Sequence, residues 1–151
     1  MTKLNEGDMA PAIHAVDQHG NEINLENFKG HKVVLYFYPK DNTPGCTAQA
    51  CNLRDNYDDM LKQGYKIIGV SPDSEKSHQK FAQKYNLPFQ LIPDPDKEII
   101  KAYGVWGRKK FMGKEYDGVF RTTFIIDEAG KIESIINKVD TKNHAVQILN
   151  P

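Results

Sequence analysis

The pattern of hydrophobic and polar positions divides the chain into short segments that alternate between strand-like and helix-like periods. Residues 33–38 are apolar without interruption, and residues 65–70 form a second, mainly apolar run. Runs of this length are typical of central strands that are covered on both faces. Ahead of them, the weakly alternating residues 12–16 and 22–25 flank a turn containing Gly20, which predicts an N-terminal hairpin that caps one edge of the sheet.

Hydrophobic positions at helical spacing follow each of the two central strands. From Cys46 the apolar positions recur every three or four residues, which predicts an amphipathic helix from Cys46 to about Gly64. Ser74 is placed to cap a second helix over residues 75–85. Two short helices are expected further along the chain: residues 97–103, closed by Gly104, and residues 142–149.

The second half of the chain adds further strands. Residues 121–127 and 131–136 flank a turn that ends in Gly130, which predicts a hairpin with glycine at positive φ. Residues 105–118, rich in glycine, lysine and aromatics, indicate either two short strands or an extended loop. Three prolines within residues 87–95 favour loop and edge strand.

The resulting order is strand, helix, strand, helix, hairpin and helix. It predicts an α/β fold with a central mixed β-sheet flanked by helices, the order found in thioredoxin-like folds. At 151 residues the chain has the length of about one domain, and it contains no internal repeat, low-complexity tract or linker. We therefore expect a single domain over residues 1–151.

Charge and hydropathy argue against several classes of partner. Twenty basic residues balance twenty acidic ones, so no net field attracts nucleic acid or an anionic membrane. The one dense basic run, residues 108–110, is interpreted as a solvated loop rather than an anion site. No segment approaches the roughly 18 consecutive apolar residues that span a bilayer, and residues 1–8 lack the apolar stretch of a signal peptide. These features predict a cytoplasmic protein.

The candidate chemistry centres on Cys46 and Cys51, which lie at the start of the helix after the first central strand. In a reducing compartment, cysteines at this spacing indicate a catalytic, redox-active or metal-binding role rather than a structural disulfide. Zinc is disfavoured, because it needs four ligands and the five histidines are scattered along the chain. Two unconnected buried thiols are a further alternative, against which the polar helix face of Cys51 argues.

Cys46 is expected in the first turn of its helix, directly after Thr43-Pro44-Gly45. A thiol reacts as its thiolate, and the free N–H groups and positive dipole end of a helix N-terminus favour an anion there. The hydroxyl of Thr43 can donate to the sulfur or to a bound oxygen atom, or it can cap the helix. The two roles are compatible.

Helix geometry separates the two sulfurs. Five residues of helix rise about 7.5 Å with a net rotation of about 140°, which places the two Cα atoms roughly 8.7 Å apart. A disulfide needs Cα atoms within about 7 Å. Cys46 lies on the apolar face of the expected helix, whereas Cys51 shares its face with charged residues. If the two cysteines pair, the first turns of the helix must unwind, with Pro44 and Gly45 as the hinge.

The cysteine stretch also resembles a known family. Pro39-x-x-x-Thr43-x-x-Cys46 is similar to the active-site motif of the peroxiredoxins. Residues 43–51, continued by Leu53-Arg54-Asp55, resemble the bacterioferritin comigratory protein, or peroxiredoxin Q, branch. The resemblance covers nearly the whole chain, because later segments agree in the same order: residues 69–71, 104–107, 112–114 and 121–127.

The resemblance implies reduction of hydrogen peroxide or organic hydroperoxides on a thioredoxin-like fold. Cys46 would be the peroxidatic cysteine that becomes a sulfenic acid, and Cys51 the resolving cysteine that forms a disulfide with it. Thr43 and the N–H of Cys46 would hold the peroxide. Arg121 would stabilise the thiolate and the departing oxygen, and Pro39 would shield the sulfur from water.

The same resemblance implies that thioredoxin or a similar dithiol protein reduces the disulfide, and that no metal or organic cofactor is needed. A monomer is expected. Two other interpretations stay open. A general disulfide oxidoreductase normally carries Cys-x-x-Cys instead of four intervening residues, and a redox-sensing or holdase module would be oxidised without repeated turnover.

Overall fold

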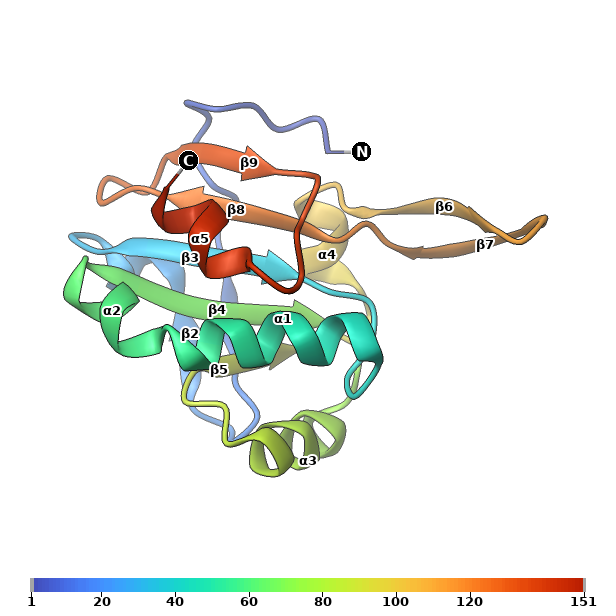
Figure 1. The fold of residues 1–151 in the computed structure, drawn as a ribbon. Helices are drawn as coiled ribbons and strands as arrows, with labels where there is room; N and C mark the ends of the chain where they lie inside the picture. The colour runs from blue at the N-terminus through green and yellow to red at the C-terminus, as the bar shows by residue number, and fades with distance from the viewer. Residues whose placement is uncertain (1, 151) are drawn as a thin grey trace.

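The computed structural model describes residues 2–150 and is built around a five-stranded mixed sheet (Figure 1). The strands follow the spatial order β5-β4-β3-β8-β9. Strands β3, β4 and β5 are parallel, and β8 runs antiparallel to both of its neighbours. The strand bounds are β3 Lys32–Phe37, β4 Tyr65–Ser71, β5 Gln90–Pro93, β8 Thr122–Ile126 and β9 Ile132–Ile136. The expected mixed α/β sheet, with the proline-rich segment as an edge strand, is confirmed.

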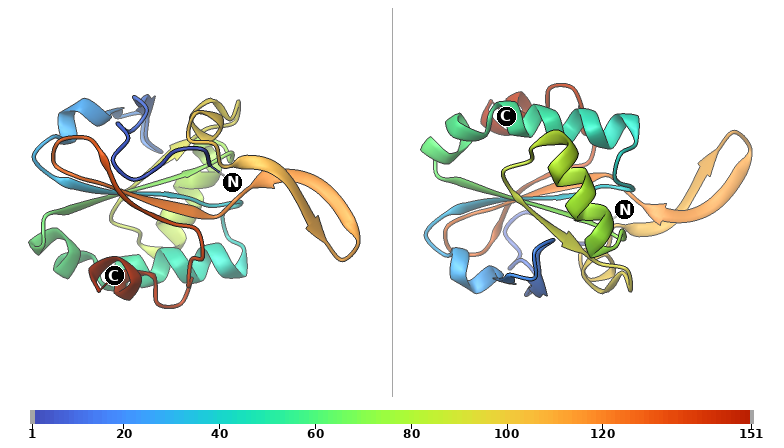
Figure 2. Two further views of the ribbon diagram at one scale, coloured as in Figure 1. Left: turned by 90° about the horizontal axis from the view of Figure 1, so that it is seen from above. Right: turned by 90° about the horizontal axis from the view of Figure 1, so that it is seen from below.

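Both faces of this sheet are covered (Figure 2). Along β3, Val34 and Tyr36 enter one hydrophobic cluster, while Val33 and Leu35 enter the other. This alternation explains the unbroken apolar run, because each face of a central strand needs its own apolar side chains. The first cluster is covered by α1 Pro44–Asp55, α2 Tyr57–Lys62, α3 Glu75–Tyr85 and α5 His144–Leu149. The second lies under β1 His14–Val16, β2 Glu22–Asn24, the 3₁₀ helix η1 Leu25–Phe28 and α4 Glu98–Ala102.

The prediction of one helix from Cys46 to about Gly64 is wrong in two respects. The helix begins at Pro44, where a missing N–H costs nothing in the first turn. It also breaks at Asn56, whose backbone leaves the helical region at φ −109° and ψ 12°. The Asn56 side chain donates to the carbonyl of Asn52 at 2.8 Å. Local side-chain hydrogen bonds of this kind compete with the helical backbone pattern.

Other local predictions are confirmed. The Ser74 hydroxyl caps α3 by accepting from the N–H of Ser77 at 3.1 Å. Gly104 and Gly130 take the positive φ values, 69° and 87°, that close the preceding helix and the β8–β9 hairpin. Helices α4 and α5 are each shorter than expected, beginning at Glu98 and His144.

The N-terminal hairpin is confirmed, but it does more than cap an edge. Ile13 and Ile23 are buried in the cluster beneath the sheet, so the hairpin covers a face. The β5 edge of the sheet is covered by one side chain from the turn of this hairpin. Gln18 accepts from the N–H of Leu91 at 2.9 Å and donates to the carbonyl of Phe89 at 3.3 Å. A glutamine amide thereby satisfies backbone groups of the edge segment that a further strand would otherwise pair.

Residues 105–118 form two strands rather than a loop. Strands β6 Trp106–Phe111 and β7 Lys114–Val119 pair as a hairpin that projects from the body of the molecule (Figures 1 and 2). Residues 108–110 were expected to form a solvated loop: Arg108 and Lys110 are exposed, but the loop is wrong, because these residues lie within β6. Lys109 is half-buried and donates from Nζ to the carbonyl of Val119 at 2.9 Å.

Within residues 2–150, no helix is both long and apolar enough to cross a bilayer. The longest of the described helices, α1, has 12 residues. At about 1.5 Å per residue this gives roughly 18 Å, well short of the roughly 30 Å hydrocarbon core.

Candidate active site

The two cysteines lie on α1, directly after the loop that follows β3. Cys46 is in the first turn of the helix and only 1% exposed, among the apolar side chains that face the sheet. Cys51 lies further along the same helix and is half-buried. Both thiols are free. Because they belong to one continuous helix, the separation derived from ideal helix geometry applies to them, and they cannot bond in this conformation.

Arg121 provides the contact that defines the site. It precedes β8, and its Nη2 donates to Sγ of Cys46 at 3.2 Å. Its Nη1 donates to Oε1 of Gln49 at 2.7 Å, so both ends of the guanidinium are held. Gly45 leaves room for this approach, because a Cβ there would lie 3.2 Å from Nη2, a tighter than ordinary contact. The fold thus brings a cation to the sulfur from a residue 75 positions away in the sequence.

Gln49 belongs to this site, and the sequence analysis missed it. It is fully buried, three residues after Cys46 on the face that packs against the sheet. A polar residue at that position of an otherwise apolar face was the available signal. Its Nε2 and the hydroxyl of Tyr36 are buried without a hydrogen-bond partner among the described residues. Burial, followed by the neighbouring Cys46, raises the pKa of Tyr36 well above its ordinary value.

Thr43 occupies the N-cap position of α1, but its side chain does not cap the helix. The hydroxyl donates instead to the carbonyl of Lys40 at 2.7 Å. The capping alternative is therefore wrong: the side chain is turned toward the carbonyl of Lys40, and its oxygen accepts from no N–H of the helix. Since its one proton is engaged, the Thr43 oxygen presents only lone pairs to its other neighbours. Pro39 is half-buried at the start of the same loop.

A second cation lies in the same electrostatic environment. Lys109 of β6 has a pKa below its ordinary value, first because of burial and then because of the positive charge of Arg121, while Cys46 acts in the opposite direction. Arg121 is thus the cation that contacts the sulfur, and Lys109 adds positive charge to the same region while its Nζ donates to Val119. A guanidinium in this position can stabilise negative charge that develops next to the sulfur.

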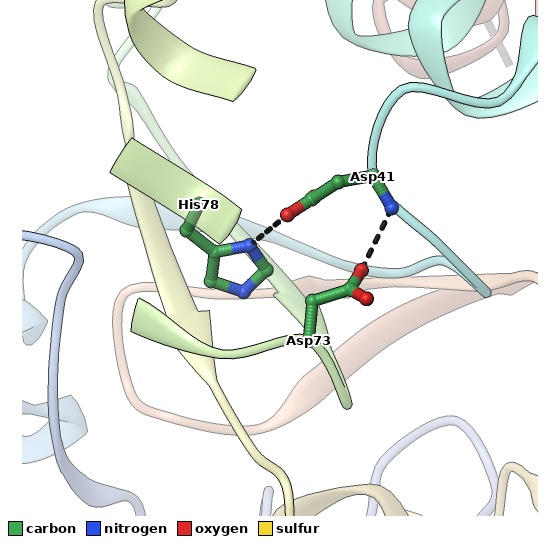
Figure 3. Close-up of side chains that lie close together, drawn as sticks. All are labelled: Asp41, Asp73 and His78. Atoms are coloured by element: carbon green, nitrogen blue, oxygen red, sulfur yellow. Dashed lines mark hydrogen bonds and ion pairs between the residues drawn. The ribbon is translucent and has the colours of Figure 1, made fainter. Parts of the chain in front are cut away.

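A separate cluster lies behind the loop. Asp41, Asp73 and His78 place possible metal-ligand atoms within 4.8 Å of one another (Figure 3). Neither cysteine belongs to this group. Asp41 and His78 contact each other directly, at 2.6 Å between Oδ2 and Nδ1, and Asp73 accepts from the N–H of Asp41 at 2.7 Å. Each of these side chains is thus already engaged in a hydrogen bond within the protein.

Comparisons with known proteins agree with this geometry. The sequence profile of the AhpC/TSA family matches residues 6–135. Peroxiredoxin Bcp of Escherichia coli K12 is 47% identical over 150 residues, covering 99% of this chain and 96% of the relative. Peroxiredoxin Bcp of Bacillus subtilis 168 is 45% identical over 143 residues, covering 95% of this chain and 91% of the relative. A solved structure described as giving insights into the alkyl peroxide reduction activity of Xanthomonas campestris bacterioferritin comigratory protein superposes with a TM-score of 0.84 at 35% identity, covering 91% of this chain and 87% of that one.

Proposed function

Because this chain belongs to the AhpC/TSA family, and within it to the Bcp or peroxiredoxin Q branch of thiol peroxidases, we propose that it reduces organic hydroperoxides and hydrogen peroxide through a sulfenic acid at Cys46. The contact of 3.2 Å between Nη2 of Arg121 and Sγ of Cys46 carries this proposal. It places a permanent cation against one of the two thiols, at a helix N-terminus. Alkyl peroxide reduction, described for the Xanthomonas campestris relative, supports the choice of substrate class.

In the first step the Cys46 thiolate attacks the terminal oxygen of the hydroperoxide. The sulfur gives two electrons, the S–O bond forms as the O–O bond breaks, and the departing alkoxide or hydroxide takes a proton from solvent to become an alcohol or water. Arg121 stabilises charge on the departing oxygen, and Gln49 holds the guanidinium in place. The N–H groups of Gly45 and Cys46 precede the first helical hydrogen bond, which Thr47 donates to Thr43, and they are free to donate to the peroxide.

The hydrogen bond between Thr43 and the peroxide has a defined direction in this step. Its hydroxyl proton is committed to the carbonyl of Lys40. Its oxygen therefore accepts the hydrogen bond of the incoming O–O–H group, while Arg121 and the helix N–H groups donate. A site with donors on one side and an acceptor on the other selects a hydroperoxide over a dialkyl peroxide, which has no proton to give.

In the second step Cys51 attacks the sulfenic sulfur, a disulfide forms and water leaves. This step requires α1 to open, because an intact helix keeps the two Cα atoms roughly 8.7 Å apart. A dithiol protein such as thioredoxin then returns both thiols by exchange and is itself oxidised. A monomer in the cytoplasm is the simplest setting for this cycle, since both cysteines lie on one chain and reducing dithiols are abundant there.

Intact mass measurement after one equivalent of peroxide tests the chemistry. The reduced chain is expected to lose two hydrogens without gaining oxygen. Cys51→Ser should stop one oxygen heavier, at the sulfenic acid, and Cys46→Ser should remain unchanged. Retention of the mass loss in Cys46→Ser would contradict the assignment.

Turnover separates a peroxidase from a module that is merely oxidised. With thioredoxin, thioredoxin reductase and NADPH, the protein should consume many equivalents of peroxide. A single equivalent consumed by correctly reduced protein would instead favour a redox-sensing role. Omission of peroxide and the Cys46→Ser variant are the controls.

A further inference from the structure

The cluster behind the active-site loop is a network rather than a set of free ligands. We infer that Asp41, held by His78, is a positioning residue. It fixes residues 39–43 to the body of the fold, so that Pro39 and Thr43 keep their places while α1 opens. The inference rests on the proposed peroxidase cycle. It adds that the unwinding of α1 stops at the loop formed by residues 39–43.

Three side chains donate to the carboxylate of Asp41, which is itself only 7% exposed. The hydroxyl of Tyr38 donates to Oδ1 at 2.6 Å, and the hydroxyl of Ser77 donates to Oδ2 at 2.8 Å. The third contact joins Oδ2 to Nδ1 of His78 at 2.6 Å. Ser77 and His78 lie in the first turn of α3, so the carboxylate ties the loop to a helix other than α1.

The position of the imidazole requires a proton between it and Asp41. Nε2 of His78 lies 3.1 Å from the carbonyl of Ile92, which can only accept, so Nε2 carries a hydrogen. Nδ1 faces a carboxylate oxygen at 2.6 Å, and two acceptors would repel at that distance. The pair therefore shares one further proton. The two side chains are 0% and 3% exposed, so the contact is shielded from water. A buried pair of this kind is costly to break.

The backbone of Asp41 is fixed as well. Its N–H donates to Oδ2 of Asp73 at 2.7 Å, and the same oxygen accepts from the hydroxyl of Ser71 at 2.9 Å. Ser71 is the last residue of β4. Both the side chain and the main chain of Asp41 are thus bound to α3 and to the end of the sheet, and none of these contacts involves α1.

This arrangement sets a boundary for local unfolding. The opening that Cys51 needs affects α1, which begins at Pro44. Asn42, between the anchor and the helix, has a left-handed φ of 59°, and its side chain accepts from Tyr85 of α3 at 3.1 Å. The loop before Cys46 therefore stays attached when the helix after it melts. On refolding, α1 closes onto a loop in which Thr43 has kept its place.

The test uses two mild variants, each of which removes one donor to Asp41: Tyr38→Phe and Ser77→Ala. Tyr103→Phe is the matched control, because Tyr103 is equally buried and donates to the carbonyl of Pro11 at 2.7 Å in the opposite hydrophobic cluster. Sulfenic acid formation with tert-butyl hydroperoxide is timed by quenched-flow mass spectrometry in a Cys51→Ser background. Disulfide formation is timed with Cys51 present. Amide exchange across residues 39–43 reports the anchor directly.

We expect Tyr38→Phe and Ser77→Ala to form the sulfenic acid about tenfold more slowly and to exchange faster across residues 39–43, because displaced groups position the peroxide poorly. The first-order conversion of the sulfenic acid to the disulfide should not slow. Tyr103→Phe should lose comparable thermal stability yet react within about twofold of the parent. A general loss of stability cannot produce that split.

Parental reaction rates and exchange in both anchor variants would overturn the inference. Equal slowing in Tyr103→Phe would also overturn it, because the effect would then follow stability alone. Failure of the parent to form any sulfenic acid would instead refute the proposed function, and the exchange measurement would still report whether Asp41 fixes the loop.

Discussion

Helices α1 and α3 pack into the same hydrophobic cluster, yet their N-termini are built differently. Helix α3 has a capping hydroxyl from Ser74 and an acidic residue, Glu75, in its first turn. Helix α1 has neither, because the Thr43 hydroxyl turns away and no acidic residue lies in its first turn. The comparison teaches that the N–H groups of α1 are left free for a ligand, at a cost in local stability.

The largest expected effect concerns Arg121, which contacts the sulfur in the first turn of α1. Arg121→Ala removes the cation 3.2 Å from the sulfur and should slow sulfenic acid formation by about 100-fold. Arg121→Lys keeps the charge but cannot hold Cys46 and Gln49 together, so recovery should be partial. Stopped-flow competition for peroxide measures both rates. Full activity in Arg121→Ala would mean that the free N–H groups alone suffice.

Replacing each of the two N-cap residues in turn tests the difference between α3 and α1 directly. Ser74→Ala removes a capping bond and should lower the free energy of unfolding by about 1 kcal/mol, without changing the peroxide reaction. Thr43→Ala removes no capping bond, so its main effect should be on the peroxide rate. Thr43→Ser, which keeps the hydroxyl, is the control. Urea unfolding and peroxide kinetics on all three variants separate the two kinds of N-cap.

Strengthening the start of α1 should delay resolution. Gly45→Ala makes the first turn a better helix former by about 0.5–1 kcal/mol, which corresponds to a roughly two- to fivefold slower disulfide formation. The new Cβ also lies 3.2 Å from Nη2 of Arg121, so a modest loss in the peroxide step is expected. Timing the two steps separately distinguishes these effects. Faster disulfide formation would contradict the view that α1 must open.

The smallest expected effect depends on pH and acts through α5, which packs on α1. Burial lowers the pKa of His144 below its ordinary 6.5, and the charge of Arg121 adds to the shift, against the hydrogen bond to Gln147. The contribution to stability is therefore complete above about pH 6.5 and is lost as the pH falls through the lower, folded-state pKa. His144→Gln should show a shallower fall in melting temperature between pH 7.5 and 5.5. An unchanged slope would argue against this role.

Local features were predictable from the sequence where the physical signal is local. The buried run of β3, the Ser74 cap and the turn at Gly130 each depend on a few neighbouring residues. The break at Asn56 was missed, because a side chain competing for a carbonyl looks like any polar helix residue. For the same reason, the sequence spacing of Cys46 and Cys51 predicted the distance between them but not which residues lie around them.

Contacts between distant segments had no such signal. The pairing of Cys46 with Arg121 joins residues 75 positions apart, and only the family resemblance anticipated it. Gln49 was readable as a polar residue on an apolar face and was overlooked. The contact between Asp41 and His78, 37 positions apart, depends on how α3 docks beside the loop. No periodicity or motif reports that docking.

The N-terminal segment has a consequence for colloidal behaviour. Gln18 occupies one edge of the sheet, and on the other edge Gly7 donates to Ile132 at 2.8 Å, while Ile132 donates to Asp8 at 2.8 Å. Open strand edges are templates for pairing with other chains. In the proposed cycle, opening α1 would uncover apolar surface, and the backbone contacts at Leu91 and Ile132 reduce the number of free edge groups that another chain could pair with.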